Sequence, residues 1–275
     1  MSYKRLSLKC LLVLSLSSLM ACNVVQTEPV STKDTIEESL QTYPSAIIEP
    51  KLVRASIEIE KRLNQREGIK ASPGQRHFEV VSGSQPIIIT APHSVRPFRK
   101  GKYRFSDGGA TAAYALALAD LVGAHVIYAS YENETDANYE DDNDFKRQLA
   151  VLIEQLDPVL ILDIHGSNPM RSYDLDVGTM NGKSLLGQPA LVTDLRDRLA
   201  AEGIVNISYN RFSASQQQTI TKFSSNKGVP TLQLEINATY LMPSEGAIEA
   251  QRFAILLQGL TRYIRSDILM NNNKN

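Results

Sequence analysis

The chain has 275 residues, of which 43% are hydrophobic and 21% are charged, and its formal net charge at pH 7 is −1. This length and composition allow one globular domain with a full hydrophobic core, with some chain left over for a tether. Lys and Arg residues are dispersed along the sequence, so it lacks the basic footprint of nucleic-acid-binding proteins, and we expect no nucleic-acid partner.

The N-terminal segment has the pattern of an export signal. Two basic residues precede an apolar stretch, Leu11 to Leu19, that is too short to span a bilayer. The following sequence, Leu19-Met20-Ala21-Cys22, resembles a bacterial lipoprotein cleavage site, in which the cysteine is lipidated. We therefore expect residues 1–21 to be a signal peptide and Cys22 to anchor the mature protein to the envelope. By the same resemblance, Asn23 in place of Asp after the cysteine favours the outer over the inner membrane. A plain export signal is the alternative.

Residues 22–50 are polar and include three prolines, which predicts a flexible tether before a single domain over residues 51–270. The chain has only two cysteines, and Cys10 lies inside the segment to be removed. The mature protein is thus expected to lack a disulfide and a thiol nucleophile. Any catalysis would use histidines, carboxylates, hydroxyls or a metal.

Beyond the tether, apolar residues at helical spacing predict a surface helix from Leu52 to Leu63. The rest of the domain alternates between strands and helices, which predicts an α/β fold of three layers. In this fold, helices cover both faces of a mixed or mostly parallel sheet. Consecutive apolar residues at 87–89 and 159–162 are typical of strands buried on both faces. The expected strands are 78–81, 87–90, 125–129, 159–164, 204–207 and 230–236, and the expected helices are 109–122, 144–155, 190–202 and 244–265.

Three of the expected strands deliver a residue that can bind a metal or move a proton, namely His93, His165 and Glu235. Ligands of open α/β sheets bind beyond the carboxyl ends of the strands, so we expect these side chains at one site. A hydrolytic zinc site uses about three His or carboxylate ligands and leaves one position for water. The pattern therefore indicates a metallohydrolase. The alternatives are a buried structural role for His165 and an ion pair with Lys or Arg for Glu235.

Asp163 lies two residues before His165, and strand alternation puts both side chains on the same face. Asp163 is therefore expected to orient the imidazole of His165 from behind. Gly166 and Ser167 are expected to let the backbone turn sharply after the histidine. Glu235 has apolar neighbours, and since a buried Glu needs a compensating charge or a task, we expect it to act as a general base.

Four segments together resemble the N-formylglutamate amidohydrolase family, which shares its fold and zinc chemistry with the zinc carboxypeptidases and the aspartoacylase group. They are Ala91-Pro92-His93-Ser94, Ser106-Asp107-Gly108-Gly109, Leu162-Asp163-Ile164-His165-Gly166 and Gln233-Leu234-Glu235-Ile236-Asn237. The resemblance spans roughly Pro86 to Leu241. It implies that His93 and His165 bind one zinc ion and that Glu235 is the base that later returns a proton to the leaving amine.

The wider zinc carboxypeptidase pattern has a Glu three residues after the first His, where this chain has Arg96. Asp107 is the candidate for the remaining ligand, with a helix N-cap as its alternative role. The family also holds the substrate carboxylate with an Asn and an Arg. Asn138, Arg147 and Arg211 are the candidates here, and a solvated surface position is the alternative for each.

The resemblance thus implies a zinc-dependent amidohydrolase that cleaves a C–N amide bond in an N-acyl amino acid or a short peptide with a free carboxylate. Two further hypotheses stay open. One is a zinc metallopeptidase that acts on cell-wall or other peptides. The other is a non-catalytic envelope lipoprotein that binds a ligand.

Overall fold

The computed structural model describes residues 45–270. The expected signal peptide, the expected lipidation site Cys22 and most of the expected tether lie outside the described residues. Within residues 45–270, no helix is both long enough and apolar enough to cross a membrane.

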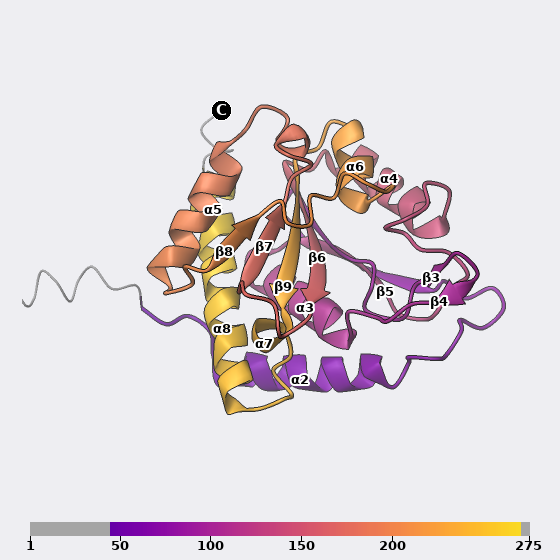
Figure 1. Ribbon diagram of the computed structural model, residues 1–275, viewed down its shortest axis with the longest axis horizontal. Coiled ribbons are helices and arrows are strands. Elements are labelled where there is room, and N and C mark those ends of the chain that lie inside the picture. The colour runs from indigo at the N-terminus through magenta and orange to yellow at the C-terminus, as the bar shows by residue number, and fades with distance from the viewer. Residues whose placement is uncertain (1–44, 271–275) are drawn as a thin grey trace, which may run out of the picture. The chain divides into compact units, whose positions relative to one another are not determined.

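A seven-stranded mixed sheet forms the centre of the domain (Figure 1). Its strands are β1 (Phe78–Val81), β2 (Ile87–Ala91), β5 (His125–Ala129), β6 (Leu160–Ser167), β7 (Leu175–Gly178), β8 (Ile207–Tyr209) and β9 (Thr231–Asn237). They lie in the order β1-β5-β2-β6-β9-β7-β8. The four central strands β5, β2, β6 and β9 are parallel, whereas β1 and β7 run antiparallel to β5 and β9. A separate hairpin pairs β3 (Phe98–Arg99) with β4 (Lys102–Tyr103).

Helices cover both faces of the sheet, so the expected three-layer α/β class is confirmed (Figure 1). One face carries α2 (Pro50–Asn64), α3 (Gly109–Val122), α5 (Ala190–Ala201), α7 (Ala238–Leu241) and α8 (Ala247–Arg262). The other face carries α4 (Asp144–Leu156) and α6 (Ile220–Asn226). A 3₁₀ turn (Lys183–Leu185) and a π-helical segment after α8 (Tyr263–Leu269) complete the elements.

Side chains of the central strands alternate between two hydrophobic cores. In β2, Ile87 and Ile89 belong to the larger core with α3 and α8, whereas Ile88 belongs to the smaller core with α4. Each such buried side chain contributes about 1.5–3 kcal/mol of hydrophobic stabilisation. In β6, Leu162 faces the larger core and Ile161 the smaller one. The alternation therefore turns every second residue of these strands toward the face covered by α4 and α6.

Most expected elements are present, including the helix predicted at 52–63, which is α2. The prediction of a strand at 204–207 was wrong, because pairing with β7 begins only at Ile207 and the strand there is β8. Sequence patterning also missed β7, the β3–β4 hairpin and α6. In β7 the apolar run is broken by Asp176 and Gly178, so its four residues carry no strand signal, although all four are buried.

Candidate active site

The register of three parallel strands collects polar side chains on the face that α4 and α6 cover. Thr90 of β2 lies opposite Asp163 of β6, and His165 of β6 lies opposite Glu235 of β9. Residues directly opposite each other in a sheet point to the same face. The expected meeting of strand-end residues is therefore a consequence of strand order and register.

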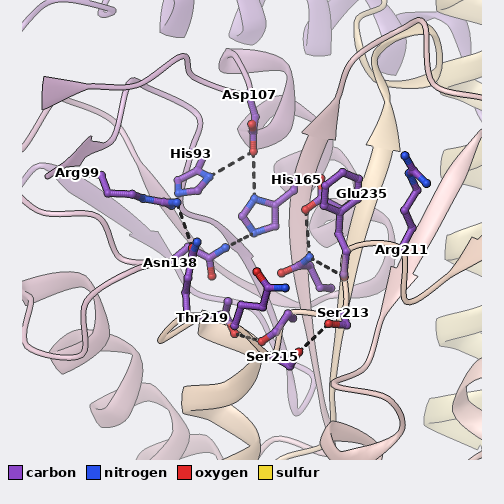
Figure 2. A pocket seen from close by; sticks show the side chains of 15 residues that line it. His93, Arg99, Asp107, Asn138, His165, Arg211, Ser213, Ser215, Thr219 and Glu235 are labelled. Atoms are coloured by element: carbon purple, nitrogen blue, oxygen red, sulfur yellow. Dashed lines mark hydrogen bonds and ion pairs between the residues drawn. The ribbon is translucent and has the colours of Figure 1, made fainter.

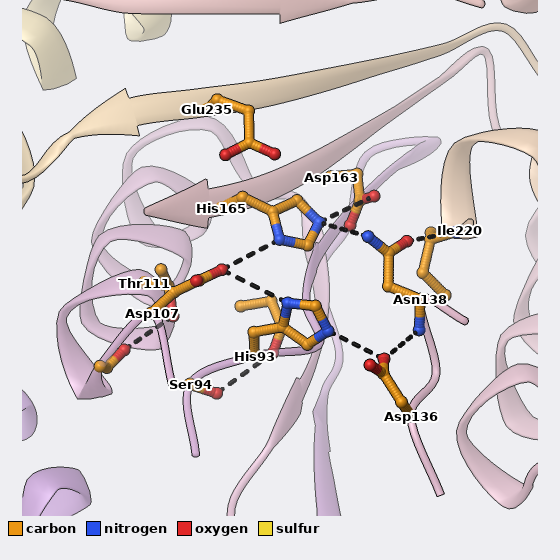
Figure 3. A network of polar contacts seen from close by, with 12 residues as sticks. His93, Ser94, Asp107, Thr111, Asp136, Asn138, Asp163, His165, Ile220 and Glu235 are labelled. Carbon is orange, nitrogen blue, oxygen red and sulfur yellow. Dashed lines mark hydrogen bonds and ion pairs between the residues drawn. The ribbon is translucent and has the colours of Figure 1, made fainter. Parts of the chain in front are cut away.

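The histidines and a carboxylate form a cluster, the candidate metal centre (Figure 3), which consists of His93, Asp107 and His165. Asp107 Oδ2 lies 3.0 Å from His165 Nδ1 and 3.5 Å from His93 Nδ1. One potential ligand atom from each residue lies within 4.8 Å of the others. Two imidazole nitrogens and one carboxylate oxygen match the donor set of a hydrolytic zinc site. The structure thus brings the three candidate ligands together.

Asp107 is held beside the histidines by its own backbone. Its N–H donates to the carbonyl oxygen of His93 at 2.9 Å. Asp107 does not cap α3, because Gly108 occupies the N-cap position and the Gly109 N–H donates to Asn64 Oδ1 at 2.8 Å. The N-cap alternative for Asp107 is therefore excluded by this geometry.

Gly166 allows the Asp107 segment to approach β6 closely. A Cβ at this position would lie 3.1 Å from the carbonyl oxygen of Asp107 and 3.2 Å from its Cβ. The expected sharp turn after His165 was wrong, because β6 continues through Ser167 and pairs with β9 to its end. The glycine is thus used for close approach of two backbones.

The second nitrogen of each imidazole faces an acidic side chain. His93 Nε2 lies 2.9 Å from Asp136 Oδ1, and His165 Nε2 lies 3.2 Å from Asp163 Oδ2. The Asp163 contact is an ion pair, since this oxygen makes no hydrogen bond, while Asp163 Oδ1 accepts one from Thr90 Oγ1 at 2.6 Å. Such partners orient metal-binding histidines and fix which nitrogen faces the ion. The placement of Asp163 agrees with the orienting role expected for it.

Sequence reasoning missed Asp136. Its carboxylate is buried and also accepts hydrogen bonds from Arg99 at 2.6 and 2.8 Å and from the Asn138 N–H at 2.8 Å. The available signal was the general need of a metal-binding histidine for a carboxylate partner. Asp136 lies in the same loop as Asn138, which the sequence did single out.

The acidic surroundings shift the pKa values of the histidines. Burial lowers the pKa of His93, but the charge of Asp136 and hydrogen bonds to Asp107 and Asp136 outweigh it and raise this pKa to about 9. The pKa of His165 is also raised well above its ordinary value, because Asp163 and Asp107 outweigh burial. The pKa of Asp107 lies well below its usual range, since hydrogen bonds from both histidines outweigh burial. The imidazoles are thus held protonated, with a proton where a cation would bind.

Glu235 lies near His165, on the neighbouring strand (Figure 3). Burial raises its pKa, the charge of His165 lowers it, and the net pKa is about 7. Gln233, on the same face of β9, donates from Nε2 to Glu235 Oε1 at 3.0 Å. A carboxyl group with a pKa near the operating pH can both accept and return a proton.

A cavity of about 450 Å³, the active-site cavity, opens at this cluster (Figure 2). Its volume suits a small organic or peptide-like ligand. The segment 211–219, between β8 and α6, supplies one wall, and most of the lining side chains are polar. The lining residues are His93, Arg99, Asp107, Asn138, His165, Arg211, Phe212, Ser213, Ala214, Ser215, Gln216, Gln217, Thr219, Gln233 and Glu235.

Of the three residues expected to bind substrate, the structure places two at the active-site cavity and one away from it. Arg211 and Asn138 line the cavity. Arg147 does not, because it lies on the exposed side of α4, where it pairs with Asp142 and Asp144. The solvated-surface alternative therefore describes Arg147.

Asn138 is already engaged within the protein. Its Oδ1 accepts a hydrogen bond from the Ile220 N–H at 2.7 Å, and its Nδ2 lies 3.3 Å from His165 Nε2. The side chain of Arg211, in contrast, makes no ion pair with any residue between 45 and 270, while its backbone N–H donates to Asp176 Oδ1 at 3.1 Å. Arg211 is thus the lining arginine available to a ligand.

The sequence matches no protein-family model and no curated protein. Solved structures of similar fold include a gene product, Atu2144, from Agrobacterium tumefaciens, with a TM-score of 0.51, 11% identity and coverage of 73% of this chain and 99% of that one. An N-formylglutamate amidohydrolase from Ralstonia eutropha has a TM-score of 0.47 and 14% identity over 70% of this chain and 99% of that one. A metallo-carboxypeptidase from Pseudomonas aeruginosa has a TM-score of 0.44 and 13% identity over 78% and 68%.

At 11% identity, the likeness to the Agrobacterium tumefaciens structure shows the fold alone.

Proposed function

We propose that the protein is a zinc-dependent amidohydrolase that cleaves a C–N amide bond in an N-acyl amino acid or a short peptide. The observation that carries this proposal is the candidate metal centre beside Glu235. Three donor atoms converge within 4.8 Å, and the neighbouring carboxyl group has a pKa of about 7. The motif resemblance to N-formylglutamate amidohydrolases supports the same reaction.

One zinc ion fits the donor set of His93, Asp107 and His165. Three protein ligands leave a coordination position open, as a catalytic site requires. The two negative charges behind the imidazoles, on Asp136 and Asp163, help to balance a divalent cation. When bound, the ion supplies a Lewis acid for the substrate carbonyl and lowers the pKa of a water molecule.

Residues of the chain carry out proton transfer, substrate binding and positioning. Glu235 accepts the proton of the attacking water and returns it to the amine nitrogen as the C–N bond breaks, so the carboxyl group ends in its starting state. Gln233 holds one oxygen of this carboxylate. Arg211, at the cavity rim, pairs with the free carboxylate of the substrate through its two-pronged guanidinium. Asn138 and Asp136 keep the histidines in place.

Metal analysis combined with hydrolysis assays tests this proposal. The wild-type protein should bind one zinc ion, lose hydrolysis of N-acyl amino acids or short peptides on chelation, and regain it with zinc. His165→Ala should lose both metal and activity. His77→Gln is the matched control, since His77 lies outside the cavity and should keep both. Wild-type protein that binds no stoichiometric metal and hydrolyses none of these compounds would instead favour the non-catalytic binding lipoprotein.

We also propose that the mature chain is anchored in the bacterial envelope through lipidated Cys22, on the basis of the N-terminal sequence pattern. Mass spectrometry of the N-terminal peptide from the membrane fraction should find Cys22 as the first residue with attached acyl chains. Cys22→Ala should release the protein from the membrane. Recovery of unmodified Cys22 in a soluble fraction would rule out the anchor.

A further inference from the structure

A second hollow adjoins the active-site cavity. Its volume is about 430 Å³, and its lining residues are Lys100, Tyr139, Gln216, Gln217 and Gln218. Gln216 and Gln217 line both spaces, so the two are neighbours with a shared wall. A ligand that fills the active-site cavity and continues past these two side chains enters the second hollow.

The second hollow is lined by a cationic side chain, that of Lys100, which has no acidic partner among the described residues. None of its lining residues is Asp or Glu. Lys100 makes no ion pair with any described residue, and its ammonium nitrogen lies 5.7 Å from the ring centre of Tyr139. Lys100 also adopts a left-handed backbone conformation, with φ 53°, in the turn between β3 and β4.

Contacts to the candidate metal centre hold the wall of the second hollow in place. Arg99, the residue before Lys100, donates to Gln217 Oε1 at 3.0 Å and to Asp136, the partner of His93. Its guanidinium also lies over the Tyr139 ring, 4.6 Å from the centre. The guanidinium of Arg99 is therefore used within the protein, and Lys100 is left as the cation that can meet a ligand.

We propose that this second hollow binds an anionic group of an extended substrate, so that the preferred substrate is an acidic peptide rather than a single N-acyl amino acid. The ammonium of Lys100 pairs with a carboxylate on a residue next to the hydrolysed amide. The glutamine side chains hydrogen-bond to peptide groups of the same segment, because each amide offers both donors and an acceptor. This inference rests on the proposed amidohydrolase function and names its substrate class.

Matched peptides that differ in one charge test the proposal. N-acetylated tripeptides are prepared in pairs in which one residue flanking the scissile amide is Glu or Gln, and kcat/KM is measured for each. The wild-type protein should prefer the Glu peptide, and Lys100→Met should reduce this preference by about two- to fivefold, the range for a solvent-accessible charge pair. Lys100→Glu should reverse the preference.

Lys102→Met is the control, because Lys102 lies on the same hairpin but faces a different hollow, with Arg96, Tyr103, Arg104 and Phe105. It should keep the wild-type preference. Equal hydrolysis of Glu and Gln peptides by the wild type, or an equal loss of preference in the Lys100 and Lys102 variants, would overturn the proposal.

Equilibrium binding to a Glu235→Gln variant separates this inference from the proposed reaction. If the wild type hydrolyses no peptide, yet the variant binds Glu peptides more tightly in a manner that depends on Lys100, the binding site stands and the amidohydrolase proposal fails. If hydrolysis occurs without any charge preference in rate or binding, the reaction stands and the site fails. No hydrolysis and no binding would overturn both.

Discussion

At the residue scale, the orientation of the His93 and His165 imidazoles determines which of their nitrogen atoms could bind a metal. Both Nδ1 atoms face Asp107, while both Nε2 atoms face carboxylates at the back, Asp136 for His93 and Asp163 for His165. Without a metal the acidic groups favour protonated imidazoles, as the raised pKa values indicate. A metal ion bound by these two histidines would therefore compete with protons for the same two nitrogens.

This competition predicts a pH dependence of zinc binding. The pKa of His93 in the metal-free protein is about 9, so below this pH zinc must displace its proton, and the raised pKa of His165 means that a second proton must also be displaced. The apparent zinc affinity should therefore rise as pH increases toward about 9. Calorimetric titration in buffers of different ionisation enthalpy should detect about two protons released per zinc at pH 7. Zinc binding without proton release would contradict the assigned nitrogens.

Asp136 gives a second prediction at this scale. Asp136→Asn removes the charge behind His93 but keeps the shape of the side chain, and it should weaken zinc binding by about 10- to 100-fold. The exposed Asp142, in the same loop, supplies the control: Asp142→Asn should leave the affinity at the wild-type value. Circular dichroism of both variants checks that the fold is retained. Equal zinc affinities in the two variants would show that Asp136 does not contribute to zinc binding.

At the scale of elements, one buried lysine helps to hold the wall of the active-site cavity. Lys146 of α4 is fully buried, and its Nζ donates to the carbonyl oxygens of Glu140 and Gln218 at 2.7 and 2.5 Å. These contacts join the loop before α4 to segment 211–219. Burial is the main reason why the pKa of Lys146 is lowered. The lysine thus links the loop that carries Asp136 to the opposite wall.

Lys146→Met should loosen this wall. The substitution removes the donor to the Gln218 carbonyl oxygen and the ion pair with Asp141, whereas the Glu140 carbonyl oxygen keeps its hydrogen bond from Asn143 Nδ2 at 2.8 Å. The lost hydrogen bond should cost about 1–3 kcal/mol of stability. Urea unfolding should show this loss, and amide hydrogen exchange should increase within segment 211–219. Lys227→Met is the control, since the ammonium nitrogens of Lys146 and Lys227 both lie 5.3 Å from the centre of the Phe223 ring, but Lys227 is exposed. Unchanged exchange in the Lys146 variant would show that the wall is held by other contacts.

The elements also show what the sequence can predict. Long apolar runs predicted the four central strands and the meeting of His93, His165 and Glu235, because period and strand-end position are local properties. The strand β7 and the helix α6 were missed, since they are short and are defined by their neighbours. Asp136 was missed for a similar reason: its contact with His93 joins residues 43 positions apart, and no local pattern reports it.

At the scale of the whole molecule, the site results from sheet order. The strands β2, β6 and β9 lie side by side although β9 comes last along the chain, and this order puts Glu235 opposite His165. The larger helical layer seals one face of the sheet, and the smaller layer of α4 and α6 leaves the active-site cavity open on the other. Glu235 and the candidate metal centre, which come from different parts of the chain, thus share one cavity.

The most direct test of the account is the activity and metal content of Glu235→Gln, measured on the same sample. The substitution keeps the size of the side chain but removes its ability to accept a proton. We predict wild-type zinc stoichiometry with kcat/KM for amide hydrolysis reduced by about 10²- to 10⁴-fold. A variant that holds its zinc and hydrolyses the substrate at the wild-type rate would contradict the assignment of Glu235 as the base.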